Sequence, residues 1–311
     1  MKLIAPPAQP SLSRVGETDD RQVTVALVQM HWAAEPEEHL ATLAEGIATA
    51  AGAGASIVFL PELTLSRYPA DTMPEGAPAD IAEPLADGPT YTFAAAAAAA
   101  HGVFVHASLY EKAEADDGLG FNTAILVAPD GSIVARTRKL HIPVTAGYYE
   151  DQYFRPGPAG SPYPVHAVDL PGAPRVGLPT WDQWFPELAR AYSLADAEIL
   201  AYPTAIGSEP DHPDFDTQPL WQSVIVGNGI ANGLFMVVPN RWGNEGLVEF
   251  YGSSFISDPY GRVLAQAGRA GVAVLVATLD LAQRRDWLDL FPFLQTRRPD
   301  TYGCLVEKET K

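Results

Sequence analysis

Three polar residues of this chain stand at the ends of segments that read as buried strands. Glu62 follows the apolar run 57–60, Lys139 ends the second strand of a predicted hairpin, and Thr180 follows the short apolar run 175–179. Ligands of α/β proteins bind at such strand ends, where a carboxylate can act as a base and a lysine can hold negative charge. Each residue also has a structural reading, because Glu62 could cap the next helix and Lys139 could protect a sheet edge.

The segment around Thr180 is dense in aromatic and acidic residues. It reads Thr-Trp-Asp-Gln-Trp-Phe-Pro-Glu over residues 180–187 and leads into a helical pattern. A strand that stops and turns into a helix presents the turn side chain and the next backbone N–H to one small volume. Hydrolases of several folds hold a nucleophile and an oxyanion donor in this way. The alternative is an aromatic-rich turn of the core.

Composition and charge exclude several classes of protein. The net charge of −18 argues against nucleic acid or an anionic membrane surface as a partner. Cys304 is the single cysteine, so neither an intrachain disulfide nor a cysteine-based metal site can form. The chain begins without the long apolar run of a signal peptide, and no apolar stretch is long enough to span a bilayer. We therefore expect a cytoplasmic protein.

Alternating strand and helix patterns indicate an α/β fold. The chain opens with a predicted strand at 23–29, a helix at 37–51 and a strand at 56–60, which is a βαβ-like beginning. Two runs of this alternation, separated near the middle, predict a pseudo-symmetric pair of mixed sheets with helices outside. Further strands are predicted at 103–109, 122–128, 132–136, 198–202, 235–239, 253–257, 262–265 and 272–278, and further helices at 90–100, 219–233 and 280–288.

The predicted domain organisation is simple. Residues 1–21 are rich in proline, serine and charge and are predicted to form a flexible arm. Residues 22–288 form one catalytic domain, and residues 289–311 form a tail that we place at an oligomer interface. Residues 70–89 read as a loop because proline and glycine are frequent there.

Several separated motifs resemble the nitrilase (carbon–nitrogen hydrolase) superfamily, most closely its N-carbamoylputrescine amidohydrolase branch. That branch has cysteine at the position of Thr180 in the 180–187 segment. The other matching motifs are Pro-Glu-Leu at 61–63, Lys-x-His-x-Pro at 139–143, Glu-x-x-Tyr-Phe-x-Pro-Gly at 150–157 and the octet at 203–210. The resemblance covers roughly residues 22–300. It implies an α-β-β-α sandwich of two mixed sheets and a homodimer or higher homo-oligomer.

The resemblance also implies residue roles. Glu62 matches the general base, Lys139 the oxyanion-stabilising lysine, and Glu150 the carboxylate that orients the lysine and the substrate, while Thr180 stands at the nucleophile position. His141 has no role in that pattern and is read as structural. The residues expected to contact a small, amine-bearing substrate are Trp181, Asp182, Trp184, Glu187, Tyr149, Ser208 and Glu209.

Two other patterns suggest a metal site and a nucleotide site, but neither is specific. His212 lies among aspartates in a proline-rich loop, which is typical of a solvated loop rather than a metal site. The glycine-rich run 227–233 mimics a dinucleotide-binding fingerprint, but no strand precedes it and its glycines fall within a predicted helix. We therefore expect no metal and no cofactor.

Thr180 changes the chemistry that the resemblance implies. A threonine hydroxyl is far less acidic than a thiol, whose pKa is about 8.5. Known threonine nucleophiles rely on an amine base, usually the chain's own N-terminus, and Thr180 is internal. The superfamily places glycine four residues before its cysteine, whereas Gly177 is three before Thr180. Pro179 also stands where a strand residue normally donates to its neighbour, so we expect a shifted strand.

Three hypotheses follow from this departure. The favoured one is non-covalent acid–base chemistry, of the cyclisation or isomerisation type, by Glu62, Lys139 and Glu150. Retaining these charged groups together at a desolvation cost favours an active site. The second is an amide or carbamoyl hydrolase that uses Thr180 or an activated water. The third is a catalytically inactive small-molecule binder or partner subunit.

Overall fold

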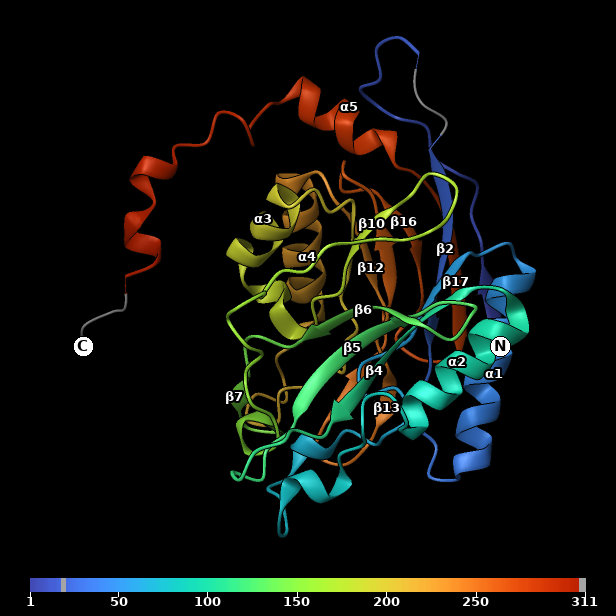
Figure 1. The fold of residues 1–311 in the computed structure, drawn as a ribbon, viewed down its shortest axis with the longest axis vertical. Helices are drawn as coiled ribbons and strands as arrows, with labels where there is room; N and C mark the ends of the chain where they lie inside the picture. Colours follow the sequence, from blue (N-terminus) through green and yellow to red (C-terminus); the bar gives the residue numbers. More distant parts are fainter. Residues whose placement is uncertain (18–20, 308–311) are drawn as a thin grey trace.

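The computed structural model describes residues 1–17 and 21–307, and its body consists of two mixed β-sheets with helices outside (Figure 1). The seven-stranded sheet has the order β1-β17-β2-β3-β4-β5-β6, and the six-stranded sheet has the order β16-β15-β12-β11-β10-β9. The first comprises β1 (Lys2–Ile4), β2 (Gln22–Gln29), β3 (Ile57–Phe59), β4 (Phe104–Glu111), β5 (Phe121–Val127), β6 (Ile133–Arg138) and β17 (Ala273–Asp280). The second comprises β9 (His166–Ala167), β10 (Arg175–Gly177), β11 (Ile199–Ala201), β12 (Phe235–Val238), β15 (Phe255–Ser257) and β16 (Val263–Gln266).

Five α-helices lie in the described part of the chain. They are α1 (Pro36–Gly52), α2 (Pro89–His101), α3 (Pro186–Leu194), α4 (Gln218–Asn232) and α5 (Ala282–Leu290). Two short ladders, β7 (Val144–Thr145) with β8 (Tyr148–Tyr149) and β13 (Trp242–Asn244) with β14 (Glu249–Tyr251), lie outside the main sheets. The predicted 70–89 loop carries two short 3-10 helices, at Pro69–Asp71 and Pro78–Ile81.

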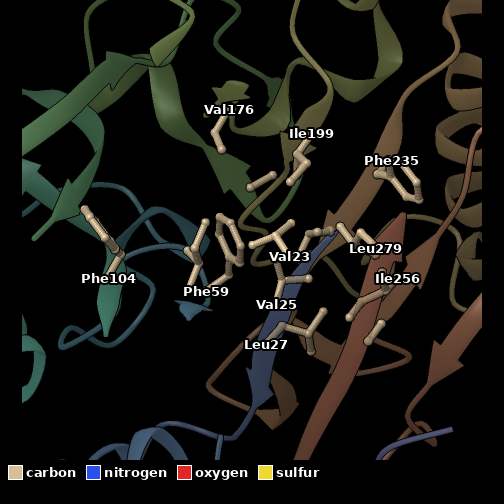
Figure 2. Packing of buried hydrophobic residues seen from close by; sticks show 14 of the residues in the cluster. Val23, Val25, Leu27, Phe59, Phe104, Val176, Ile199, Phe235, Ile256 and Leu279 are labelled. Carbon is tan, nitrogen blue, oxygen red and sulfur yellow. The ribbon is translucent and has the colours of Figure 1, made fainter. Parts of the chain in front are cut away.

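The main core lies between the two sheets. In β2, Val25 and Leu27 face that core, whereas Ala26 and Val28 face the layer of α1 and α2, as the two-residue period of a strand requires. Across the core, side chains of the second sheet such as Val176 meet those of the first (Figure 2). Because both faces of the strands are covered, their sequences read as nearly continuous apolar runs.

A separate apolar cluster joins the second sheet to its own helices. Tyr192 of α3 and Trp221 of α4 pack with Leu200 of β11 and Met236 of β12. Helix, sheet, sheet and helix therefore stack in the order α-β-β-α. This is the sandwich of two mixed sheets that the sequence predicts.

The N-terminal residues are not a free arm. Lys2–Ile4 forms β1, which pairs in parallel with β17. Further along, Arg14 forms ion pairs with Asp280 at 2.6 Å and Asp286 at 2.8 Å. The prediction of a flexible segment at 1–21 is therefore wrong for residues 1–17, because long-range pairing at the sheet edge overrides the local composition. Residues 18–20 of that prediction lie outside the described residues.

The C-terminal segment differs from the rest of the molecule. After α5, the chain leads away from the two sheets (Figure 1), and Phe291, Leu305 and Val306 are exposed. Residues 308–311 of the predicted tail lie outside the described chain. Among the helices that the structure describes, none combines the length and the apolar character needed to cross a bilayer.

Candidate active site

Lys139 is the centre of a buried charged set. It directly follows β6, and its ammonium Nζ lies 3.1 Å from Glu62 Oε1 and 2.5 Å from Glu150 Oε2. Glu62 follows β3, and Glu150 opens the 3-10 helix Glu150–Gln152. All three side chains are at most 2% exposed. The structure thus brings together three charged groups from distant parts of the sequence, with Glu62 and Glu150 88 residues apart.

The Glu62 carboxylate is held at both oxygens. Asn122 Nδ2 donates to Oε1 at 2.7 Å, and the backbone N–H of Ala205 donates to Oε2 at 2.9 Å. The following residue, Leu63, has a φ of 50°, an uncommon conformation for a branched side chain. Arg241 fixes this turn by donating to the carbonyls of Glu62 and Leu63. Oε2 has a second lone pair that can accept a proton from a small molecule.

Glu150 has an unusual affinity for protons. Burial raises its pKa to about 7, and the negative charge of Glu62 adds to this, while Lys139 and the Tyr68 hydroxyl oppose it. Tyr68 donates to Glu150 Oε1 at 2.8 Å. Burial lowers the pKa of Lys139, but the two carboxylates outweigh burial and hold that pKa above its usual value. Lys139 therefore stays charged, while burial and the charge of Glu62 make Glu150 easier to protonate than an exposed glutamate.

Thr180 is fully buried at the turn that precedes the 3-10 helix Trp181–Trp184. The indole ring of Trp181 lies 5.7 Å from Lys139 Nζ, which places this turn beside the charged set. Thr180 Oγ1 has no hydrogen-bond partner within the described chain, so it is not bonded to Glu62. The geometry lacks the nucleophile–base hydrogen bond that marks an activated hydroxyl.

The strand that leads into this turn ends early. β10 stops at Gly177, before Pro179, so the proline costs no hydrogen bond within β10. A side chain at Gly177 would come within 2.7 Å of Tyr192 and Leu200, which explains the glycine at this point. The ladder thus ends before Pro179, and the predicted shift of the strand relative to the superfamily stays a prediction.

His141 and Asp182 join the two catalytic segments. Asp182 Oδ1 accepts the backbone N–H of His141 at 3.0 Å and lies 2.6 Å from the ring nitrogen Nδ1. The His141 ring stacks on Phe185 with a centroid distance of 3.6 Å. Asp182 is fully buried, and its other carboxylate oxygen, Oδ2, has no hydrogen-bond partner among the described residues, so its contact with a substrate stays a prediction.

The other residues predicted to contact a substrate differ in their exposure and in their hydrogen bonds. Tyr149 and Trp184 are half-buried, and Glu187 is exposed on α3, without a contact to the charged set among the described residues. Ser208 Oγ accepts the backbone N–H of Glu249 at 3.0 Å. Burial raises the pKa of Glu209, whose Oε1 lies 3.4 Å from Thr217 Oγ1.

Sequence reasoning missed several residues of the site. Tyr68, Asn122 and Arg241 bond to the charged set or to its backbone. Asn122 could have been recognised from the sequence, because it is a polar residue at the start of an apolar strand and buried polar groups need hydrogen-bond partners. Tyr68 lies in an irregular segment that offers no comparable signal. The described residues contain no group of three His, Cys, Asp or Glu side chains suited to a metal ion.

Comparison with known proteins identifies the family. The model of the carbon–nitrogen hydrolase family matches residues 24–289. The chain is 37% identical to a citrullinase of Francisella tularensis, over 92% of this chain and 99% of that one. It is 34% identical to N-carbamoylputrescine amidase of Arabidopsis thaliana, over 92% and 96%. The crystal structure of a carbon–nitrogen hydrolase from Helicobacter pylori is similar, with a TM-score of 0.80, 29% identity, and coverage of 92% and 99%. The chain belongs to the carbon–nitrogen hydrolase family, within the nitrilase superfamily.

Proposed function

We propose that this protein hydrolyses the carbon–nitrogen bond of an amide or carbamoyl group on a small, amine-bearing molecule, with water as the nucleophile. The observation that carries the proposal is the buried set of Glu62, Lys139 and Glu150, in which Lys139 bonds to both carboxylates. A buried ammonium beside a carboxylate supplies an electrophile and a base in one desolvated volume.

In this reaction, Glu62 Oε2 takes a proton from a water molecule as the water oxygen attacks the carbonyl carbon. The carbonyl oxygen becomes negative, and Lys139 Nζ stabilises it. The carbon–nitrogen bond then breaks, and the proton held by Glu62 passes to the leaving nitrogen. A carbamoyl group thus yields ammonia and a carbamic acid, and a primary amide yields ammonia and a carboxylic acid. The acid then gives its proton to ammonia, so that ammonium and the anion are released.

Water is preferred to Thr180 as the nucleophile because Thr180 Oγ1 has no hydrogen bond to a base. Its hydroxyl is too weak an acid for a carboxylate to deprotonate efficiently. Among the described residues, Glu62 Oε2 accepts only the Ala205 N–H, so it has a lone pair that can accept a hydrogen bond from water. In this proposal Thr180 shapes the pocket.

The relatives also bear on the choice between hydrolysis and isomerisation. Both curated relatives described above carry the names of hydrolytic enzymes, a citrullinase and an amidase. Neither name supports the cyclisation or isomerisation favoured from the sequence. Hydrolysis needs the same three charged groups and agrees with these relatives.

A second candidate is a binder without turnover. The unpartnered hydroxyl of Thr180 favours it, since the superfamily pattern has a thiol there and the single cysteine of this chain, Cys304, is exposed. Such a protein would bind N-carbamoylputrescine, citrulline or a short amide and release no ammonia.

Ammonia release from these three compound classes tests the proposal. We expect turnover by the parent protein, a loss of about a hundredfold or more in Glu62→Gln, and a change of only a few-fold in Thr180→Ala. An acyl adduct on Thr180, detected by mass spectrometry, would instead establish a covalent route. Binding by calorimetry without ammonia release would establish the binder.

A further inference from the structure

Two buried polar side chains, Asn240 and Arg241, come just after β12 and are 0% and 3% exposed. Single β-bridges join Arg241 to Met30, which follows β2, and Asn240 to Thr204, which lies beyond the end of β11. The ends of three strands from both sheets therefore meet at this dipeptide. A buried amide and a buried guanidinium must be compensated by hydrogen bonds, and their partners show what the dipeptide holds.

Asn240 holds the segment that bonds to the Glu62 carboxylate. Its Oδ1 accepts the backbone N–H of Ile206 at 3.1 Å, and its Nδ2 donates to the Ile206 carbonyl at 3.0 Å. The residue before Ile206 is Ala205, whose N–H donates to Glu62 Oε2 at 2.9 Å. Asn240 thus fixes the segment that supplies one of the donors to Glu62.

Arg241 holds the backbone of the same glutamate. Its Nη2 donates to the carbonyls of Glu62 at 2.6 Å and Leu63 at 3.0 Å, and both Nη atoms lie 3.3 Å from the Ser66 carbonyl. A guanidinium can bond to several carbonyls at once because its donors form a rigid planar fork, which an ammonium lacks. Glu62 is therefore held at its backbone by Arg241 and at its carboxylate by a segment that Asn240 fixes.

Glu245 extends this network to the second carboxylate of the charged set. Its Oε1 and Oε2 accept Arg241 Nη1 at 2.9 Å and 2.7 Å, and this ion pair is buried. Oε2 also accepts the backbone N–H of Tyr68 at 2.9 Å. The Tyr68 hydroxyl donates to Glu150 Oε1 at 2.8 Å. One chain of contacts thus runs from Arg241 through Glu245 and Tyr68 to Glu150.

We propose that Arg241, together with Asn240 and Glu245, positions both carboxylates of the charged set. The inference rests on the proposed function, because Glu62 and Glu150 are the groups that would carry out the hydrolysis. Arg241 acts on them through backbone and side-chain contacts and is a positioning residue. A misplacement of about 1 Å at a reacting group can cost on the order of a hundredfold in rate, so such contacts affect turnover directly.

Steady-state kinetics of Arg241→Lys test the contact with Glu62. Lysine keeps the positive charge beside Glu245 but lacks the planar fork, so the carbonyls of Glu62 and Leu63 lose their shared donor. The substrate is whichever of N-carbamoylputrescine, citrulline and a short amide the parent hydrolyses fastest. We expect kcat for ammonia release to fall at least about tenfold, while KM changes by less than about twofold.

Arg262→Lys is the matched control. Arg262 lies in the turn between β15 and β16, and its Nε bonds to Asp258, four residues away, at 2.6 Å. This substitution should lower the thermal midpoint and leave kcat unchanged, as expected for an ion pair that only stabilises the fold.

The contact with Glu150 can be tested without turnover. The titratable groups that interact with Glu150 are Lys139, Glu62, Tyr68 and Tyr148. Glu245→Asp keeps a charge beside Arg241, but its shorter side chain withdraws from the Tyr68 N–H. The bond from Tyr68 lowers the pKa of Glu150, so weakening it should raise that pKa further.

The measurement is the melting temperature against pH, relative to the same protein carrying Glu150→Gln. Stability from the protonated Glu150 is lost as the pH rises through its pKa, so Glu245→Asp should move this loss to higher pH. Tyr68→Phe should move it in the same direction. The double variant should move it no further than Tyr68→Phe alone, because both changes act through one hydrogen bond.

The outcomes separate this inference from the proposed function. A parent that releases no ammonia, together with an upward shift in Glu245→Asp, would reject the hydrolysis and support the positioning role. An unchanged kcat in Arg241→Lys, or an equal fall of kcat in Arg262→Lys, would overturn the role of Arg241. An unshifted pH dependence in folded Glu245→Asp, or shifts that add in the double variant, would overturn the link to Glu150.

Discussion

At the scale of single residues, Lys139 matters because it compensates two buried carboxylates at once. Its ammonium lies within 3.1 Å of Glu62 and 2.5 Å of Glu150, and all three groups are shielded from water. Replacing one partner of a buried ion pair by an uncharged residue leaves the other charge buried without a counter-charge. The resulting loss of folding free energy is far larger than the stabilisation that the intact pair provides.

We therefore predict that Lys139→Met destabilises the protein by about 3–5 kcal/mol. The free energy of unfolding in urea measures this, and Lys112→Met, at an exposed position, is the control. The triple variant Glu62→Gln, Lys139→Met, Glu150→Gln should recover part of the loss, because no buried charge of the set remains. A single variant as stable as the parent would contradict the burial of this ion pair.

Glu150 gives the protein a pH dependence of stability. Its pKa is raised from 4.5 to about 7, chiefly by burial, so the folded state binds a proton more tightly than the unfolded state. This stability is fully present below pH 4.5 and is lost as the pH rises through about 7. We expect the melting temperature of the parent to fall between pH 5 and 8 relative to that of Glu150→Gln. Parallel melting curves for the two proteins across this range would disprove the shift.

At the scale of elements, the His141–Asp182 contact holds the end of β6 against the turn after β10. Lys139 is two residues from His141, and Thr180 is two residues from Asp182, so this contact sets how the two catalytic segments face each other. Asp182 accepts hydrogen bonds from the backbone N–H and from the ring of His141. Its loss leaves the backbone N–H without this acceptor, whereas the His141 ring is 38% exposed and can bond to water.

Asp182→Ala should therefore destabilise the protein by about 1–3 kcal/mol. His141→Ala should cost less, because the backbone N–H of residue 141 keeps Asp182 as its acceptor and only the ring's contacts with Asp182 and Phe185 are lost. Hydrogen exchange should also become faster over residues 139–143 and 180–185 in Asp182→Ala. Asp169→Ala, an exposed carboxylate, is the control. Unchanged exchange in both segments would show that the contact does not hold them together.

Much of the element pattern could be predicted from the sequence. The strands near 23–29, 56–60 and 272–278 and the helix near 219–233 appear within a few residues of their predicted limits, since apolar periodicity reports burial directly. The pairing of Lys2–Ile4 with β17 could not be predicted, because three residues carry no period and their partner is far away in sequence.

The same distinction applies to the site. Glu62 and Lys139 could be selected because each stands at a strand end within a recognisable motif. The Tyr68–Glu150 bond and the Asn122–Glu62 bond depend on the packing of distant segments, which local pattern does not encode. The requirement for glycine at position 177 depends on the close approach of Tyr192, which is likewise a tertiary contact.

At the scale of the whole molecule, the segment after α5 leaves apolar side chains uncovered. Phe291, Leu305 and Val306 are 53%, 61% and 87% exposed, and they lie on the part of the chain that leads away from the sheets. Exposed apolar groups gathered on one segment favour association. We therefore retain the prediction of a homodimer or larger assembly that includes this segment.

Light scattering after size-exclusion chromatography tests this prediction. The parent should show at least twice the mass of one chain, and a chain that ends at Leu290 should dissociate at micromolar concentration. A triple replacement of the three apolar residues by serine is the matched variant that keeps the chain length. A parent that stays monomeric at high concentration would exclude the assembly.

The ladder between β2 and β17 has a consequence for synthesis on the ribosome. Gln22 pairs with Asp280, so this ladder joins one of the earliest strands to the last one. A growing chain must be synthesised as far as Asp280 before β2 gains its full partner on that side. Until then β2 presents an open edge that can pair with other nascent chains. Closure of this ladder should therefore be slow, and yield should depend on expression rate more than on the final stability of the protein.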